Sequence, residues 1–197
     1  MITKTPVSIF FNFRSPYCYL ASKRMFDLLA RYDVDIDWRP LGGWDGRSPP
    51  ERAKVKIPLV RQDVARFCRR MAIPFNPPPS NADDTAAARG SLYAESKRKL
   101  QAFVTEVMHA EWGEGNDIGQ TNVLVEVAGR VGLEIGPFSA ALSDKASADR
   151  LTANWEYAVR KGVLGVPTFV VGDAIFWGND RLEFVEDHLN ELRLGRR

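Results

Sequence analysis

The sequence has few residues that bind metals or form disulfides. Among 197 residues there are two cysteines, Cys18 and Cys68, and two histidines. Two cysteines are too few for a disulfide scaffold or for a zinc site made of four cysteines. With only two histidines as well, a zinc site of ordinary ligands is hard to build. We therefore expect no metal centre and no disulfide framework.

Long apolar runs are also absent. No segment approaches the roughly 18 consecutive apolar residues of a membrane-spanning helix. Residues 1–13 include a short apolar stretch, but they lack the long apolar core and the small-residue cleavage site of a signal peptide. We therefore expect a soluble, cytoplasmic protein with no membrane partner.

Net charge is small. The 27 Lys and Arg residues against 25 Asp and Glu residues leave a formal charge of +2, so bulk charge gives no argument for nucleic-acid binding. The distribution is uneven, because residues 47–70 hold eight basic and two acidic residues, a local charge of +6. This basic segment is either an anion site or a solvated helix face. Lys56, beside a loop, is the kind of side chain that could hold a carboxylate.

Strand patterns lie near the two ends of the chain. Periodicity and turn residues predict strands over 7–13, 33–38, 168–171 and 174–177. Helical spacing predicts helices over 17–29, 58–71, 85–110, 122–131, 137–142 and 148–161. A final helix follows Asp180 and Glu183, which resemble a capping box.

This element order is that of an α/β, thioredoxin-like fold split by an inserted all-helical domain. The β-α-β unit comes first and the α-β-β-α unit last, and no strand pattern occurs between about 45 and 150. We expect residues 1–44 and 150–197 to form a discontinuous thioredoxin-like domain and residues 45–149 to form the insertion.

The first chemical motif is Ser15-Pro16-Tyr17-Cys18, at the predicted start of a helix. Unpaired backbone N–H groups at a helix N-terminus favour an anion such as a thiolate. Thioredoxin-like oxidoreductases have Cys-x-x-Cys there, whereas this motif has one sulfur and cannot run a dithiol cycle by itself. The alternative is a plain helix cap, with Cys18 a buried apolar residue.

Two C-terminal features could bind a peptide. Val166-Pro167 precedes a predicted strand and is a candidate cis-proline turn, which would expose the Val166 backbone to a peptide-like ligand. An ordinary trans proline is the alternative. The turn Gly178-Asn179-Asp180 offers N–H groups for a carboxylate and a side-chain carboxylate for an amine. Asp180 could instead simply cap its own helix.

Taken together, these motifs resemble a known family. Ser-Pro-Tyr at 15–17, Gly-Val-Pro-Thr at 165–168, Phe-Trp-Gly-Asn-Asp-Arg at 176–181 and the helical insertion resemble the 2-hydroxychromene-2-carboxylate isomerases. These enzymes group with the kappa-class glutathione transferases among the disulfide-oxidoreductase-like thioredoxin folds. The resemblance covers nearly the whole chain and extends to Lys56 and to Trp112.

The resemblance implies glutathione as a bound cofactor and a homodimer as the assembly. By position, Ser15 is the catalytic residue that hydrogen-bonds the glutathione sulfur. Val166, before a cis Pro167, pairs with the cysteinyl backbone. The Asn179-Asp180 turn holds the γ-glutamyl group, and Lys56 lies near the bound ligand.

The implied reaction is cis-trans isomerisation of an aromatic 2-oxo acid by reversible addition of the glutathione thiolate. Tyr17, Trp44 and Trp112 are candidate walls for the aromatic substrate, with core packing as the alternative for each. Three rival functions remain: a glutathione transferase, a thiol–disulfide oxidoreductase using Cys18, and a binding protein without activity.

Overall fold

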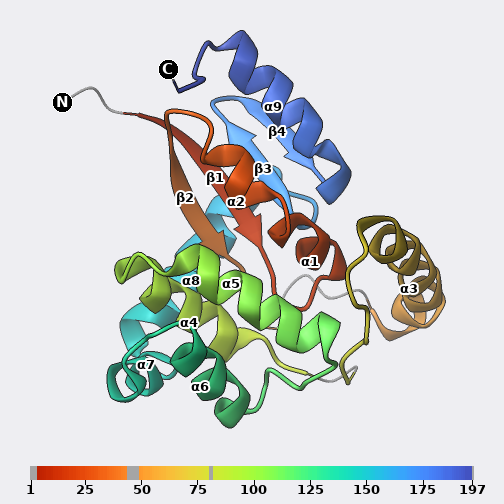
Figure 1. Cartoon of the computed structure of the whole chain (residues 1–197), viewed down its shortest axis with the longest axis vertical. Coiled ribbons are helices and arrows are strands. Elements are labelled where there is room, and N and C mark those ends of the chain that lie inside the picture. Colours follow the sequence, from red (N-terminus) through yellow and green to blue (C-terminus); the bar gives the residue numbers. More distant parts are fainter. Residues whose placement is uncertain (1–3, 44–48, 80–81, 197) are drawn as a thin grey trace.

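The computed structural model describes residues 4–43, 49–79 and 82–196. Its centre is a four-stranded mixed sheet in the order β2-β1-β3-β4 (Figure 1). The strands are β1 (Thr5–Phe11), β2 (Val34–Pro40), β3 (Thr168–Val171) and β4 (Ala174–Trp177). The two ends of the chain thus build one sheet.

The strand pairing follows the predicted topology. β1 and β2 run parallel, while β3 is antiparallel to both β1 and β4. β3 and β4 form the expected hairpin, whose turn uses Gly172 at a φ of +60°, a conformation that glycine adopts without steric cost. All four predicted strands are confirmed, and the bounds of the first two shift by one or two residues.

Helices make up most of the remaining chain. The α-helices are α1 (Pro16–Ser22), α2 (Met25–Leu29), α3 (Pro50–Met71), α4 (Thr85–Ser96), α5 (Leu100–Met108), α6 (Thr121–Arg130), α7 (Ile135–Ala141), α8 (Lys145–Arg160) and α9 (Leu182–Glu191). A π-helical turn, η1 (His109–Gly113), follows α5, and a 3₁₀ turn, η2 (Asn179–Arg181), precedes α9.

Three helix predictions need correction. α3 begins at Pro50, eight residues before the predicted start, and contains Pro58 in its interior. The predicted helix over 85–110 is divided, because Arg98 adopts a φ of +57° between α4 and α5. The predicted helix over 17–29 is also two helices, α1 and α2. Apolar periodicity continued across these breaks, so the pattern alone did not show them.

The predicted capping box is wrong. Arg181 occupies the N-cap position of α9, which has no side-chain cap. The Asp180 carboxylate instead forms an ion pair with Arg181 at 2.8 Å. The intervening 3₁₀ turn moves Asp180 out of the cap position, which leaves its carboxylate exposed.

The sheet is covered on both faces. On one face Phe10 and Val170 pack with Ala158 of α8. On the other face the alternate residues of β1 join the main cluster of buried side chains with α1, α2 and α9. In Figure 1, α4 to α7 gather at one end of the sheet and α3 stands at the side, near α1. The main cluster continues into α4 and α5, and the division into two domains stays a prediction.

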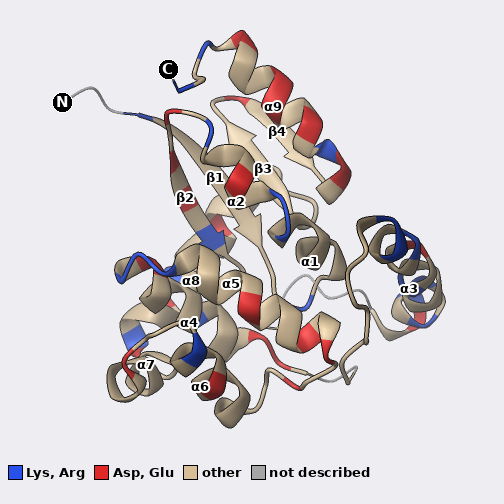
Figure 2. Ribbon diagram, viewed as in Figure 1, with Lys and Arg blue, Asp and Glu red and all other residues tan. Residues whose placement is uncertain are grey.

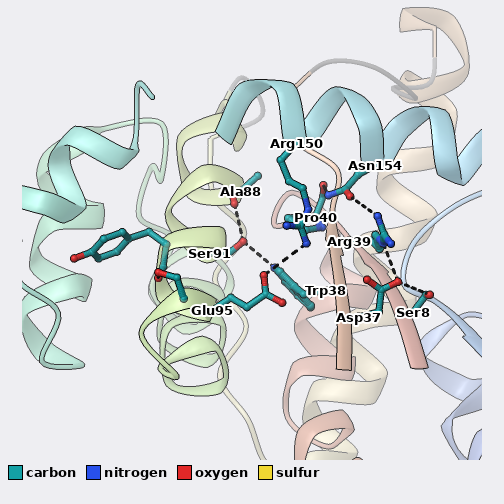
Figure 3. Close-up of polar contacts among 12 residues, drawn as sticks. Ser8, Asp37, Trp38, Arg39, Pro40, Ala88, Ser91, Glu95, Arg150 and Asn154 are labelled. Atoms are coloured by element: carbon teal, nitrogen blue, oxygen red, sulfur yellow. Dashed lines mark hydrogen bonds and ion pairs between the residues drawn. The ribbon is translucent and has the colours of Figure 1, made fainter. Parts of the chain in front are cut away.

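Polar contacts fasten β2 to the helical part (Figure 3). The indole N–H of Trp38 donates to Ser91 Oγ at 2.9 Å, which connects β2 to α4. Arg39 Nη1 donates to Asn154 Oδ1 at 3.3 Å, and Asn154 Nδ2 donates to the Pro40 carbonyl at 3.0 Å. Because these partners are mostly buried, the bonds also satisfy groups that would otherwise be costly to desolvate.

Within the described residues, no helix is both long and apolar enough to cross a membrane.

Candidate functional site

The turn between β1 and α1 places Ser15 where the sequence predicted. Ser15 is the N-cap of α1, its Oγ accepts from the Cys18 N–H at 3.4 Å, and Pro16 occupies the first helical turn. This arrangement is the usual role of a serine followed by proline at a helix start. The Ser15 hydroxyl also donates to the Val166 carbonyl at 3.3 Å. Two segments far apart in the sequence therefore meet at this side chain.

The Val166-Pro167 peptide bond is cis, as the sequence analysis considered. Val166 is half-buried and lies just before β3. Its backbone N–H donates no hydrogen bond within the part of the chain that the structure describes. A backbone donor of this kind, at the end of a strand, can pair with an extended peptide.

The turn that carries Asn179 and Asp180 is anchored to the same place. The Gly178 N–H donates to the Pro167 carbonyl at 2.9 Å. Gly178 has a φ of +120°, and a Cβ atom at this position would lie 2.5 Å from Asp180 Oδ1. Asn179 is half-buried and Asp180 is exposed. The close approach explains why glycine stands at this position.

Tyr17 connects α1 with α3. Its hydroxyl donates to Asp63 Oδ2 at 2.8 Å. Burial raises the pKa of Tyr17 to about 12, and its hydrogen bond to Asp63 and the negative charges of Asp63 and Asp180 add to the rise. Tyr17 is therefore a neutral phenol at physiological pH. No sequence pattern indicates this contact, although Asp63 is one of only two acids in the basic segment.

Lys56 lies on the same helix as Asp63 and is exposed. Seven residues separate the two, which puts them on one helical face and about 10 Å apart along the axis. Figure 2 marks Lys and Arg positions in blue along the ribbon of α3. The described basic residues of the segment, all exposed, are Arg52, Lys54, Lys56, Arg61, Arg66, Arg69 and Arg70. This exposure is what a solvated helix face predicts for these side chains.

Of the two tryptophans predicted to line the substrate pocket, the structure describes only Trp112. Trp112, in the π-helical turn, is 8% exposed, and its indole N–H donates to the Phe13 carbonyl at 2.9 Å. Its ring stacks on Phe75 with 6.2 Å between centroids. Trp112 thus braces the backbone just before the Ser15 turn. Trp44 lies outside the described residues.

Both cysteines are buried and free. Burial raises the pKa of Cys18 to about 12, despite the hydrogen bonds that lower it. Burial also raises the pKa of Cys68. At neutral pH Cys18 therefore has almost no thiolate, which is the reactive form of cysteine.

The geometry brings Ser15, Val166, Pro167 and the Asn179-Asp180 turn together beside α1. Residues 6–190 match the family of the DSBA-like thioredoxin domain. The chain belongs to this family. Membership confirms the thioredoxin-like fold with added helices that the element order predicted.

Similarity to individual proteins narrows the family to one type of enzyme. The chain is 34% identical to 2-hydroxychromene-2-carboxylate isomerase of Sphingobium xenophagum, over 95% of this chain and 99% of that protein. It is 29% identical to the enzyme of the same name from Pseudomonas putida, over 94% and 95%. A solved 2-hydroxychromene-2-carboxylate isomerase has a TM-score of 0.82 at 29% identity and 95% coverage of both chains. These relatives confirm the resemblance found in the motifs and support an isomerase function.

Proposed function

We propose that this protein is a glutathione-dependent isomerase of an aromatic 2-oxo acid, of the type that converts 2-hydroxychromene-2-carboxylate to trans-o-hydroxybenzylidenepyruvate. The observation that carries the proposal is the Ser15 hydroxyl, placed at the start of α1 and 3.3 Å from the Val166 carbonyl. The reaction class is supported by relatives that match nearly the full chain and are named 2-hydroxychromene-2-carboxylate isomerase. The thiol of Cys18, in the first turn of α1, is buried and therefore not available to a substrate.

The described residues fit an anionic tripeptide. Val166 offers a backbone N–H with no described partner, which suits the cysteinyl backbone of glutathione. The exposed Asp180 carboxylate suits the γ-glutamyl ammonium group, and Asn179 beside it offers an amide. Lys56 adds a positive charge from α3, which suits a carboxylate. These groups are complementary in chemistry to the cysteinyl backbone, the ammonium group and one carboxylate of glutathione, which supports the proposal.

Glutathione, when bound, would supply a thiolate that adds to the substrate's conjugated double bond and leaves after that bond has rotated. The part of Ser15 is to donate its hydroxyl proton in a hydrogen bond to the sulfur. Its present bond to the Val166 carbonyl is long for a hydroxyl donor, so exchanging one acceptor for another costs little. Tyr17, whose pKa is raised to about 12, stays protonated and is not the base.

The test is Ser15→Ala. We expect glutathione-dependent turnover to fall at least about tenfold, the size of effect expected when a hydrogen bond to a charged group is lost. Ser22→Ala is the control, because Ser22 lies on the same helix and its hydroxyl, within the described part of the chain, donates only to the Tyr19 carbonyl. Circular dichroism checks that both variants fold. Wild-type turnover in Ser15→Ala, or full activity without glutathione, would contradict the proposal.

Product analysis separates isomerase from transferase, since both would use this site. Mass spectrometry of the product should show an isomer of the substrate with no glutathione attached. A retained adduct would make the protein a transferase. A disulfide-reductase assay covers the third alternative, and the raised pKa of Cys18 predicts no activity that depends on this thiol.

A further inference from the structure

A group of ionisable side chains lies on the buried side of the Ser15 turn. Asp84, just before α4, and Glu111, in the π-helical turn, are both 0% exposed. Arg14 directly precedes Ser15 in the chain, and its Nη1 lies 3.9 Å from Asp84 Oδ1. The same Nη1 donates to the Gly43 carbonyl at 2.8 Å. The fold thus brings the buried Asp84 carboxyl group to the Arg14 guanidinium, and the charge of Glu111 also acts on that guanidinium.

The Glu111 carboxyl group is the unusual member. Among the residues that the structure describes, neither of its oxygens has a hydrogen-bond partner. The indole N–H of the neighbouring Trp112 is donated to the Phe13 carbonyl instead. An ionised carboxylate in this setting would have lost its hydration without gaining a bonded partner, which is strongly unfavourable. The protonated form avoids most of that cost.

The local backbone explains how a glutamate comes to lie here. In the π-helical turn, the four consecutive residues Ala110 to Gly113 are all buried. Four consecutive positions of a regular α-helix spread around nearly the whole circumference, so burying all of them requires neighbours on every side. π-helical turns are rare and are frequently found at functional sites. Glu111 is therefore held inward by the backbone together with Trp112, which braces the turn.

Every charged group around Glu111 acts on its ionisation. Burial and the charge of Asp84 raise the pKa of Glu111 well above its ordinary value, and Asp117, which follows the π-helix, adds to the rise. The positive charge of Arg14 and the dipole of the nearby Trp112 N–H oppose this rise with smaller effects. Asp83, beside Asp84, acts on the same guanidinium of Arg14. The neutral acid is thus the form that burial and the two neighbouring aspartates favour.

The charge on these carboxyl groups reaches the site. Negative charge on Asp84 and on Glu111 raises the pKa of Cys18, three residues after Ser15. A second thiolate, held at the Ser15 hydroxyl, would experience repulsion of the same sign. An additional negative charge on Glu111 would therefore disfavour a thiolate at Ser15.

We propose that Glu111 is a positioning residue that keeps its proton at neutral pH, so that the Ser15 turn carries one buried negative charge fewer and accepts the glutathione thiolate. The link to the thiolate rests on the proposed function, whereas the proton on Glu111 does not. A protonated Glu111 favours the binding of ligands that carry a thiolate.

The first test measures the proton alone. The unfolded chain releases the Glu111 proton near pH 4.3, whereas the native protein keeps it to higher pH. Above that pH the native wild type should hold about one more proton than the unfolded chain at this site, so its stability falls as pH rises towards the native pKa. We expect Glu111→Gln to lose this part of the pH dependence in urea unfolding.

Two variants make the measurement specific. Glu114→Gln is the matched control, because Glu114 is an exposed glutamate three residues away that pairs with His109. It should keep the wild-type pH dependence of stability. Glu111→Leu is the second test variant if Glu111→Gln does not fold. Equal pH slopes in the wild type and in both Glu111 variants would overturn the proposal.

The second test measures glutathione binding by calorimetry across the pH range. As Glu111 ionises, wild-type affinity should fall by up to about tenfold for each pH unit, whereas Glu111→Gln should not show this fall. A proton on Glu111 together with no glutathione binding in any variant would refute the proposed function and the link to the thiolate. Glutathione binding without the extra proton would refute the inference about Glu111 and leave the proposed function standing.

Discussion

On the solvent side of the turn that leads into α1, Ser15 is half-buried and its hydroxyl meets the backbone of a distant loop. On the inner side, Cys18 is fully buried, and its pKa is raised to about 12. The sulfur is the more reactive atom by type and the hydroxyl the less reactive one, yet burial reverses their availability. The comparison teaches that burial, rather than atom type, decides which of these two groups a ligand can reach, as the proposed function requires.

The strongest way to break this comparison is to place a sulfur on the solvent side. In Ser15→Cys the new thiol is half-buried, so it should ionise far more readily than Cys18. We expect it to react with an aromatic disulfide reagent at least about a hundredfold faster than Cys18 does in the wild type. The measurement is the rate of reagent release at neutral pH.

The control for this variant is Ser15→Cys combined with Cys18→Ala, which assigns the fast reaction to position 15. Equal rates in the wild type and in Ser15→Cys would show that the two sides of the turn do not differ in access or ionisation.

A smaller effect is expected at the loop that faces Ser15. In Gly178→Ala the new methyl group would displace the Asp180 carboxylate, because the Cβ position lies 2.5 Å from Oδ1. We expect glutathione affinity to fall about tenfold, together with a loss of about 1–3 kcal/mol in unfolding free energy from the backbone conformation. Calorimetry and urea unfolding measure the two effects.

Gly162→Ala is the matched control, since Gly162 has a φ of +71° and nothing within 4 Å of its Cβ position. It should lose stability without losing glutathione affinity. If both variants bind glutathione as the wild type does, the Asp180 turn has no part in the site.

The smallest effect is expected on α3, at the edge of the solvent side. Lys56→Ala should weaken glutathione binding about threefold and change stability by less than about 0.5 kcal/mol, since exposed charges interact weakly through water. Added salt should reduce the difference from the wild type. Lys54→Ala, also exposed on α3, is the control and should bind as the wild type does. Equal losses in both variants would mean that the basic segment acts only by its total charge.

The fold was largely predictable from local patterns. The alternation of residues 33–38, the tight turn at Gly172 and the serine-proline start of α1 each gave a correct element. Errors arose where apolar periodicity crossed a local break, as at Arg98, or where proline at position 58 was taken for a helix start. Periodicity reports which side is apolar, but it does not report whether the backbone continues.

The site was predictable in its residue types and less so in its contacts. Serine at position 15 and a proline at 167 could be singled out from motifs, whereas the hydrogen bond from Tyr17 to Asp63 joins helices far apart in the sequence. Trp112 was expected as a substrate wall, and the structure buries most of it against Phe13 and Phe75. No spacing rule indicates which of several aromatic residues will be enclosed.

By itself, the sequence determined the strands, the start of α1 and the absence of a second sulfur in the Ser15 motif, because each depends on neighbouring residues. Only the tertiary structure decided which groups meet and which are denied water. Ser15 faces Val166 because β1 and β3 are adjacent in the sheet. Cys18 and Glu111 are enclosed because helices pack around them. Ionisation depends on that enclosure, and burial is a property of the whole fold rather than of any segment.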